Sequence, residues 1–480
     1  DAFPGKEFDF LLANPPYGKS WKVDLQNMGG KDGIRDPRFK VMHDGEELSL
    51  VTRSSDGQML FLANMVAKMN NSSALGSRIA EVHNGSSLFT GDAGQGESNI
   101  RRWIIENDWL EAIVALPLNL FYNTGIATYI WVLSNRKPAH RQGKVQLIDA
   151  TQWFRSLRKN LGMKNCELSP EDIGRITRVF EEFKETPESK IFPNKAFGYW
   201  KVTVERPLRL RSQLTLKAIE SLRFNSGDED IRAALYEEFG DDLFSNFAKI
   251  AAKLQARLAD WGSDDAENDD EEGGSTKKGL PEKKQRKLLD PKTWERDGRL
   301  VETAMALRAA LGEKVYEDHN IFRNAVDKAL TTAGIRLSAA DLKVILRAVS
   351  ERSEDAPPVI AKVHKPGKAK ADPLHGFFEA NVAGKLAIVE YEPDGELRDT
   401  EQVPLLENGG IEAFFKREVL TYTSDAWIKE DATKIGYEVS FIRHFYKPQP
   451  LRPLDVIAAD ILAIEKEAEG LLDGLLKGGQ

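Results

Sequence analysis

The sequence predicts an α/β region followed by a mainly helical region. Three observations support this fold class. In residues 1–150, short apolar runs alternate with amphipathic segments, as expected for strands and helices of a doubly wound sheet. Between residues 151 and 261, and again after residue 291, apolar residues mostly follow helical spacing. Near the end of the chain, apolar residues recur at alternating spacings of four and three, which is typical of a long helix.

Within residues 1–150, five apolar or β-branched runs are predicted to be strands of one sheet. One helix is expected after Asp56, which suits an N-cap, and another after Ser98. The order of strand, loop, helix, strand, helix and three strands fits part of a doubly wound sheet that ends in a hairpin. Residues 18–57 show no clear periodicity and are predicted to be a long loop. The predicted strands cover residues 8–13, 78–82, 111–116, 127–133 and 144–149.

Three further regions follow this α/β region. Residues 151–261 are predicted to be helical, with a short β element at 197–204. Residues 262–290 change from an acidic tract to a basic one and are predicted to be a disordered charged linker. Residues 291–480 are predicted to be a mainly helical domain, interrupted by an irregular stretch and a short β element at 386–391.

The last helix is expected over residues 455–477, where six apolar residues form a heptad seam. Such a seam packs either on its own domain or on the helix of a partner, and the sequence favours neither. The seam consists of Ile457, Ile461, Ile464, Ala468, Leu471 and Leu475.

Composition narrows the class of protein. The 480 residues are 41% hydrophobic and 30% charged, as expected for a soluble globular protein of two to four domains without a membrane span. The single cysteine, Cys166, excludes an intramolecular disulfide and fits a reducing cytoplasm, so we expect a cytoplasmic protein. The seven histidines show no metal-ligand spacing, and no metal site is predicted.

Charge weighs against strong DNA binding by this chain alone. The formal net charge is −8, whereas DNA affinity depends mainly on neutralising phosphates. Local basic groups nevertheless occur, and each is either a solvated face or a phosphate contact. They are Arg155, Arg158, Lys159 and Lys164, and then Arg206, Arg209 and Arg211.

The most informative motif is Asn14-Pro15-Pro16-Tyr17, which directly follows the first predicted strand. The two prolines force the chain to leave the sheet in an extended turn. That places an amide, two carbonyls and an aromatic ring at the carboxyl end of a strand, where open α/β sheets bind ligands. A planar substrate with an exocyclic amine could use all of these groups. A turn without a binding role is the alternative interpretation.

Several segments together resemble one family. The Asn14–Tyr17 motif is similar to the catalytic motif of amino-group DNA methyltransferases, and further segments resemble the modification (M, HsdM-type) subunit of type I restriction-modification systems. The resemblance covers most of the chain and is specific in residues 1–150 and 434–480. Its segments are Ser87–Gly91, Ser98–Trp103, Ala115–Pro117, Phe121–Ala127, Lys434–Glu438, Phe445–Lys447 and Arg452–Leu454.

The resemblance implies transfer of a methyl group from S-adenosylmethionine to adenine N6 in double-stranded DNA. The implied catalytic residues are Asn14, Pro15, Pro16 and Tyr17. The Asn14 side chain and the Pro15 carbonyl would accept hydrogen bonds from the amine, and Tyr17 would stack on a flipped base. Phe121 or Tyr122 is a candidate for the second aromatic wall, although a core role fits equally well. The implied partners are the specificity (S) subunit, the restriction (R) subunit and a second M subunit, in a bacterial cytoplasm.

The sequence departs from this family in one respect. Members carry a glycine-rich cofactor motif upstream of the catalytic motif, and the residues before Asn14 contain none. We therefore expect the C-terminal half of a Rossmann-like methyltransferase sheet, in a C-terminal fragment that is inactive alone. The cofactor-binding residues stay unknown, because the Gly91–Gly96 turn does not follow a strand in the corresponding place.

A structural expectation follows from the missing motif. The strand at 8–13 should belong in the middle of a sheet, beside a strand that this chain lacks. We expect it to be disordered, paired with another molecule or covered by rearrangement.

Two alternative functions stay open. The chain could be a non-catalytic assembly module that binds the specificity subunit through its last helix. It could instead be a solitary adenine-specific DNA methyltransferase.

Overall fold

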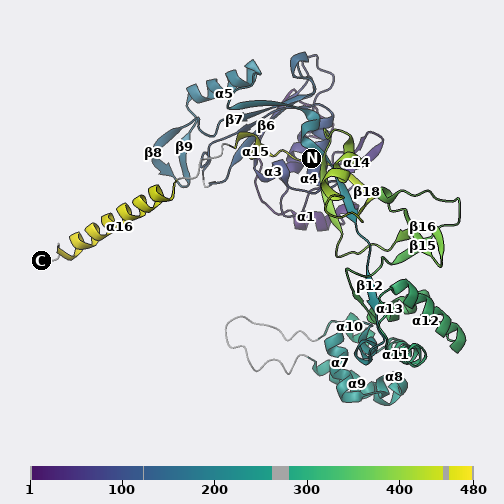
Figure 1. Cartoon of the computed structure of the whole chain (residues 1–480). Helices are drawn as coiled ribbons and strands as arrows, with labels where there is room; N and C mark the ends of the chain where they lie inside the picture. Colours follow the sequence, from purple (N-terminus) through teal and green to yellow (C-terminus); the bar gives the residue numbers. More distant parts are fainter. Residues whose placement is uncertain (1–2, 123, 262–279, 447–452, 478–480) are drawn as a thin grey trace. The chain divides into compact units, whose positions relative to one another are not determined.

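The computed structural model describes residues 3–122, 124–261, 280–446 and 453–477 (Figure 1). The chain forms two compact units. The sheet unit comprises residues 1–201, 402–411 and 434–480, and the inserted unit comprises residues 202–401 and 412–433. These units interleave along the sequence, so their boundaries do not coincide with those expected at residues 150 and 290.

The sheet unit contains a mixed six-stranded sheet in the order β1-β4-β6-β5-β7-β10. β1 is parallel to β4, and β5 is parallel to β7, whereas β6 is antiparallel to both of its neighbours and β10 is antiparallel to β7. The five predicted strands are confirmed, and β10 is an addition. The strands span Phe10–Ala13 (β1), Arg78–Asn84 (β4), Leu110–Ala115 (β5), Thr128–Ser134 (β6), Lys144–Asp149 (β7) and Ser189–Pro193 (β10).

Helices cover both faces of this sheet. α2 (Gln58–Val66) and α4 (Gly96–Glu106) share one core with Ile113 of β5. Val114, the next residue of β5, belongs to a second core with residues of α5 (Pro170–Glu182), so that helix covers the opposite face. α5 begins with a capping box, in which Ser169 and Asp172 exchange side-chain to backbone hydrogen bonds.

Two sequence-based helix starts differ in detail from the structure. The N-cap of α2 is Gly57, one residue after the predicted cap Asp56, whose Oδ1 accepts from the Gln58 N–H at 3.1 Å. α4 begins at Gly96, before the predicted cap Ser98. The Ser98 hydroxyl oxygen instead accepts from the Tyr437 N–H at 3.1 Å.

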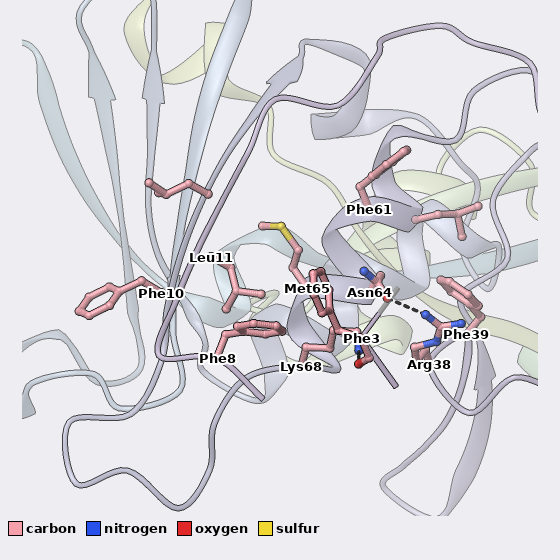
Figure 2. A pocket seen from close by; sticks show the side chains of 12 residues that line it. Phe3, Phe8, Phe10, Leu11, Arg38, Phe39, Phe61, Asn64, Met65 and Lys68 are labelled. Atoms are coloured by element: carbon pink, nitrogen blue, oxygen red, sulfur yellow. Dashed lines mark hydrogen bonds between the residues drawn. The ribbon is translucent and has the colours of Figure 1, made fainter. Parts of the chain in front are cut away.

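β1 lies at an edge of the sheet, where it pairs with β4 alone among the described residues. Its side chains alternate, with Phe10 and Leu12 75% and 81% exposed and Leu11 packed on the core. Figure 2 shows Phe10 pointing away from Phe8 and Leu11. The expectation of a disordered or covered strand is wrong here, because the parallel ladder with β4 is sufficient to order it.

The predicted long loop at 18–57 contains regular elements. It holds helix α1 (Lys22–Asn27), the short helix η1 (Lys31–Gly33) and a hairpin of β2 (Lys40–His43) and β3 (Glu46–Ser49). Asp44 and Gly45 connect the two strands with φ of 47° and 83°. Two positive φ values in succession are those of a tight hairpin turn, for which Asp-Gly is a favoured pair.

A second unpredicted hairpin occupies the start of the region expected to be helical. β8 (Arg155–Leu161) and β9 (Lys164–Glu167) form a two-stranded antiparallel sheet of their own (Figure 1). The β element expected at 197–204 is confirmed as β11 (Gly198–Glu205), in a three-stranded sheet with β17 (Asp399–Pro404) and β18 (Trp427–Tyr437).

Between residues 216 and 348 the described part of the inserted unit is helical, as predicted. Its buried Arg232 lies against the face of Trp294 and 2.7 Å from Asp297, which joins two helices inside the unit. The helices are α6 (Leu216–Ser221), α7 (Glu229–Phe239), α8 (Asp242–Ser245), α9 (Phe247–Asp260), α10 (Glu282–Leu288), α11 (Pro291–Leu311), α12 (His319–Ala333) and α13 (Ala339–Ala348).

Two expectations for this region need correction. Of the predicted charged linker, residues 262–279 lie outside the described residues, whereas residues 280–290 include α10, whose Leu288 is buried beside Trp294. Residues 291–480 are less helical than predicted, because after Ala348 the chain forms several strands before the helices near its end. The strands of the inserted unit span Leu210–Ser212 (β12), Ser350–Arg352 (β13), Ile360–Val363 (β14), Phe378–Val382 (β15) and Lys385–Tyr391 (β16).

The C-terminal segment returns to the sheet unit. Tyr437, Val439 and Phe441 join the main core, and the short helix α15 spans Phe441–Phe445. The heptad-patterned segment forms one helix, α16 (Leu454–Lys477). Its Ile457, Ile461 and Ile464 are 36%, 60% and 65% exposed, whereas the side chains of Leu471 and Leu475 lie outside the described residues. Across the described part of the chain, every helix is too short or too polar to cross a membrane.

Candidate functional site

The candidate site lies where the parallel strands of the main sheet end. β1 and β4 run in the same direction, and Ala13 lies opposite Glu81. The Asn14–Tyr17 motif therefore leaves β1 at the edge where β4 ends at Asn84. β5 also runs in this direction, because both β4 and β5 are antiparallel to β6. The loop that follows β5 and bears Phe121 and Tyr122 starts at the same edge, as expected for a ligand site in an α/β sheet.

The Asn14–Tyr17 motif has an internal hydrogen bond that orients its amide. The Tyr17 hydroxyl donates to Asn14 Oδ1 at 2.6 Å. Asn14 is exposed, Pro15 is buried and Tyr17 is half-buried. Because Oδ1 already accepts this bond, the amide has a preferred orientation before any ligand arrives. Burial, and then the charge of Glu81, raise the pKa of Tyr17, which keeps its hydroxyl a donor.

A buried carboxyl group lies beneath the motif. Glu81 is fully buried on β4, and its Oε2 lies 3.2 Å from His83 Nε2, an ion-pair distance that does not meet hydrogen-bond geometry. Burial raises the pKa of Glu81, an effect that His83 partly offsets. The electrostatic effect of Glu81 on Tyr17 links this pair to the motif.

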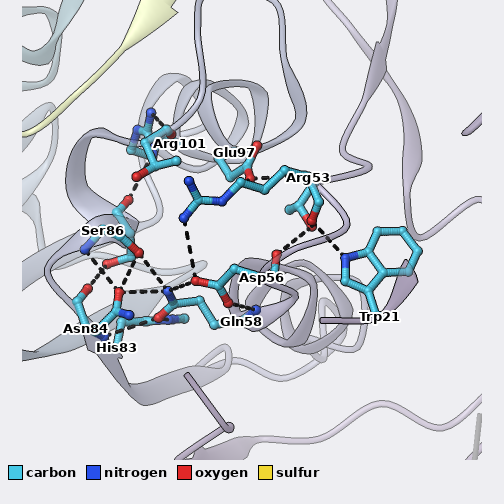
Figure 3. A network of polar contacts seen from close by, with 12 residues as sticks. Trp21, Arg53, Asp56, Gln58, His83, Asn84, Ser86, Glu97 and Arg101 are labelled. Carbon is cyan, nitrogen blue, oxygen red and sulfur yellow. Dashed lines mark hydrogen bonds and ion pairs between the residues drawn. The ribbon is translucent and has the colours of Figure 1, made fainter. Parts of the chain in front are cut away.

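A polar network continues from His83 along the end of β4 (Figure 3). The Gln58 side chain connects it, with Oε1 lying 3.2 Å from His83 Nδ1 and accepting from the Asn84 N–H at 3.1 Å. Its Nε2 lies 2.7 Å from both Asp56 Oδ2 and Asn84 Oδ1. The Asn84 side chain in turn accepts from the Ser86 hydroxyl at 2.6 Å. These contacts fix the polar groups at the end of β4.

The two candidates for a second aromatic wall differ in their surroundings. Phe121 is half-buried and packs against the core that includes Val114 and Leu116, which is a structural role. Tyr122 is 66% exposed at the same edge of the sheet and is available to a ligand. The structure therefore separates two neighbours that the sequence left equivalent.

Sequence reasoning missed an apolar groove of about 480 Å³ at this edge. One wall follows β4 and includes Phe89, the floor includes Ile126 and Tyr129, and the other wall is Val439–Arg443. The second wall comes from the far end of the chain and is held in place by Arg101, whose guanidinium donates to the Tyr437 carbonyl at 2.5 Å. Only the motif-like segment at 434–438 hinted at this association.

The Gly91–Gly96 turn is explained by internal packing. A Cβ on Gly96 would lie 2.1 Å from the Val51 carbonyl oxygen, and one on Gly91 would lie 2.8 Å from the Glu97 Cβ. Gly94 has a φ of 78° and faces the Lys434 side chain. These glycines permit close approach of the chain to itself, so the turn does not fit a cofactor cradle.

Among the described residues, one group of three side chains has its ligand atoms close enough to hold a metal ion, and it is formed by His43, Asp44 and Glu106. His43 Nε2 lies 2.6 Å from Glu106 Oε2, and the same oxygen accepts from Arg102 Nε at 3.0 Å. Arg102 also pairs with Glu46 at 2.6 Å. These contacts explain the group as a brace between the β2–β3 hairpin and α4.

Comparisons with known proteins give relatives for the sheet unit. Residues 1–197 match the N-6 DNA Methylase family. The MjaIX methylase subunit of a type I restriction enzyme from Methanocaldococcus jannaschii is 30% identical over 185 residues, which are 38% of this chain and 30% of the relative. The MjaVII methylase subunit from the same organism is 32% identical over 183 residues, covering 37% of this chain and 28% of the relative.

A solved structure gives a weaker likeness. The methyltransferase subunit of a type I restriction-modification system from Streptococcus thermophilus is 23% identical, with a TM-score of 0.32 over 41% of this chain and 37% of that chain. The curated relatives are matched over about 30% of their length.

Proposed function

We propose that the sheet unit carries the adenine-facing half of a DNA methyltransferase site. The premise is that residues 1–197 match the N-6 DNA Methylase family and that this chain is similar to type I restriction enzyme methylase subunits. The reaction is transfer of a methyl group to adenine N6. The observation that carries this proposal is the ordered Asn14–Tyr17 motif at the carboxyl end of β1.

The chemistry requires an amine to become a better nucleophile. The lone pair of an exocyclic amine is delocalised into the ring, so the nitrogen reacts poorly. In the proposed site, Asn14 Oδ1 and the Pro15 carbonyl accept hydrogen bonds from the two N–H groups. This favours a tetrahedral nitrogen and aims its lone pair away from the ring plane. Positioning and electrostatics then supply the catalysis, without a covalent enzyme intermediate.

The base must leave the duplex to reach these groups, which costs a few kcal/mol of stacking and pairing. Stacking on Tyr17 would offset part of this cost. The Tyr17 hydroxyl bond to Asn14 supports a dual role, since the same residue holds the amide and offers the ring. We propose Tyr122 as the second wall, because it is exposed whereas Phe121 packs in the core.

S-adenosylmethionine would supply the methyl group in this proposal: its S–CH₃ bond breaks as the N6–CH₃ bond forms, the donor leaves as a neutral thioether, and N6 loses one proton. The Gly91–Gly96 turn is used for internal packing, which supports the view that it does not hold this donor. The open edge of β1 supports the view that the sheet is the C-terminal half of a Rossmann-like methyltransferase sheet. We therefore propose that this chain alone is inactive and that the donor site requires further strands beside β1.

The test is expression with a specificity subunit in a host that lacks adenine methylation, followed by mass spectrometry of N6-methyladenine in its DNA. Supplied with a segment that completes the β1 edge, the chain should methylate, and Asn14→Ala should lower methylation by about 10²-fold or more, the scale of losing one preorganised hydrogen-bonding group. Tyr17→Phe, which keeps the ring, should lower it less than Tyr17→Ala. Unchanged methylation by Asn14→Ala would overturn the proposal.

Inactivity of the 480-residue chain has a separate test. Calorimetric titration with S-adenosylmethionine should show no micromolar binding, and the chain alone should give no N6-methyladenine. Micromolar binding would contradict the inferred absence of a donor site.

A second proposal concerns assembly. The apolar stripe of α16 is exposed, and its heptad spacing suits a partner helix. We propose that α16 binds the specificity subunit, in a cytoplasmic complex that also includes a restriction subunit and a second copy of this subunit. Ile457→Asp combined with Ile461→Asp should abolish capture of the specificity subunit. Retained capture would favour a solitary methyltransferase or another interface.

A further inference from the structure

The β8–β9 hairpin is a basic element that the proposed function does not yet use. Its strands join at Gly162, which has a φ of 60°, and Arg155 pairs with Glu167 across the base of the hairpin. Residues 155–167 contain four basic residues and one acidic residue, Glu167. This is a local positive charge on a chain whose net charge is −8.

The hairpin is fixed to the loop that follows β5. The Asn165 N–H donates to the Asn119 carbonyl at 3.2 Å, and Lys164 Nζ donates to the Leu120 carbonyl at 2.7 Å. The Cys166 thiol donates to the Leu118 carbonyl at 3.2 Å. All three carbonyls belong to residues just before Phe121 and Tyr122, so the hairpin and the Tyr122 loop hold one another in position.

A further contact joins the turn of the hairpin to the far end of the same loop. A Cβ on Gly125 would lie 2.6 Å from the Met163 Cε, so glycine lets the turn approach closely. The hairpin thus contacts the loop on both sides of Tyr122. Any ligand that reaches Tyr122 comes close to the hairpin.

Two of the four basic residues already have partners. Arg155 forms an ion pair with Glu167 at 2.7 Å, and Lys164 Nζ donates a hydrogen bond to the Leu120 carbonyl. The side chains of Arg158 and Lys159 are exposed, and no residue in the described ranges forms an ion pair or hydrogen bond with either. An arginine binds phosphate through two parallel hydrogen bonds, and a lysine binds it as a point charge.

We propose that the β8–β9 hairpin binds the DNA phosphate backbone beside the flipped adenine through Arg158 and Lys159. This inference rests on the proposed function and deepens it. A flipped nucleotide requires its flanking backbone to be held in register, and phosphate contacts do this without reading sequence. The position of the hairpin against the Tyr122 loop supports this partner, and its charge complements the backbone.

The test is DNA binding by the full chain as a function of salt. Fluorescence anisotropy with a labelled duplex, between about 50 and 200 mM salt, gives the slope of log affinity against log salt concentration. For Arg158→Ala with Lys159→Ala, we expect this slope to become shallower by about 1.8, since each lost phosphate contact contributes about 0.9. Both side chains are exposed, so circular dichroism should show the fold unchanged.

A matched control removes the same charge at the opposite edge of the sheet. Lys144 starts β7 and lies opposite Pro193 of β10, and Lys195 follows two residues later in the chain. Lys144→Ala with Lys195→Ala should leave the slope unchanged. An equal change in both double variants would indicate a general charge effect and would overturn the proposal.

Other outcomes also decide the matter. Failure of the wild-type chain to bind duplex at about 50 mM salt would reject the hairpin as a DNA contact. If Arg158→Ala with Lys159→Ala leaves the salt slope unchanged but weakens capture of the specificity subunit, the hairpin takes part in protein assembly. That result would overturn the proposed phosphate contact. Failure of the proposed function has a different readout, namely N6-methyladenine that is insensitive to Asn14→Ala, and it would leave the salt slopes as measured.

Discussion

The strands at the two edges of the main sheet differ in sequence and in exposure. At one edge, β10 ends in Pro193, which cannot donate to a further strand, and it includes Lys190, a residue that disfavours added strands. At the other edge, β1 consists of Phe10-Leu11-Leu12-Ala13, apolar on both of its faces. Phe10 and Leu12 are 75% and 81% exposed. β10 has the sequence of an edge strand, whereas β1 has the sequence of an interior strand.

Both strands lie at an edge of the sheet, but only β1 has a sequence that does not suit an edge position. Next to β10, the central residues of β7 are buried, and all six residues of β5, the strand after that, are buried as well. Next to β1, residues of β4 are alternately buried and half-buried. We infer that the sheet is complete at the β10 edge and open at the β1 edge. The open edge also carries the Asn14–Tyr17 motif, so in the proposed function the strands that complete this edge would also complete the site.

The largest expected effect on the free energy of unfolding comes from comparing a leucine-to-alanine substitution in the core with the same substitution at the open edge. Leu133, on the central strand β6, is fully buried, so Leu133→Ala should lower the free energy of unfolding by about 2–5 kcal/mol. Leu12→Ala at the open edge should change it by less than about 0.5 kcal/mol. Urea unfolding followed by circular dichroism measures both. Similar losses for the two variants would mean that Leu12 is buried in solution and that the open edge is covered.

A smaller, pH-dependent effect is expected at Glu81 on the strand next to β1. Burial raises the folded-state pKa of Glu81 above its ordinary value of 4.5. The folded state then binds more protons than the unfolded state, so stability falls as pH rises from about 4.5 through the raised pKa. Glu81→Gln removes this titration, and each unit of elevation corresponds to about 1.4 kcal/mol.

The measurement for Glu81 is urea unfolding of the wild type and of Glu81→Gln over a pH series. The difference between the two should grow in favour of the glutamine variant as pH rises through this window. At pH values below the unfolded pKa, the titration contributes nothing and serves as the internal control. A difference that stays constant with pH would contradict a raised pKa for Glu81.

The smallest expected change in stability concerns β1 itself. Phe10→Lys with Leu12→Lys should alter the free energy of unfolding by less than about 0.5 kcal/mol, since both side chains are exposed. The same change should reduce self-association in sedimentation velocity, because charged edge strands resist pairing. If the double variant associates as the wild type does, the open edge is not the contact between copies.

Much of the sheet could be predicted from sequence because its strands are apolar and β-branched. Ile113 and Val114 point to opposite faces of β5 and are both buried, which makes the run continuously hydrophobic. The β8–β9 hairpin lacked such a pattern, since Arg158, Lys159 and Asn160 place polar residues on both faces. The β2–β3 hairpin did have a recognisable feature, the Asp44-Gly45 turn, within a stretch otherwise predicted to be loop.

The site was predicted in part. The Asn14–Tyr17 motif lies at the end of a strand as expected. The hydrogen bond from Tyr17 to Asn14 could not be predicted from the sequence, because it depends on the fold of the turn. The groove beside Phe89 could not be predicted, because its second wall is Val439–Arg443. No local pattern relates residues so far apart in sequence, and only three-dimensional packing brings them together.

The bond between Arg101 and the Tyr437 carbonyl has a consequence for synthesis. Arg101 is fully buried, and its guanidinium also donates to the Ser87 and Thr90 carbonyls, so the main core contains a charge that needs Tyr437. A ribosome must therefore complete the inserted unit before the first-made unit can close. Until then, nascent residues 1–201 lack Tyr437, Val439 and Phe441 and keep an incomplete core.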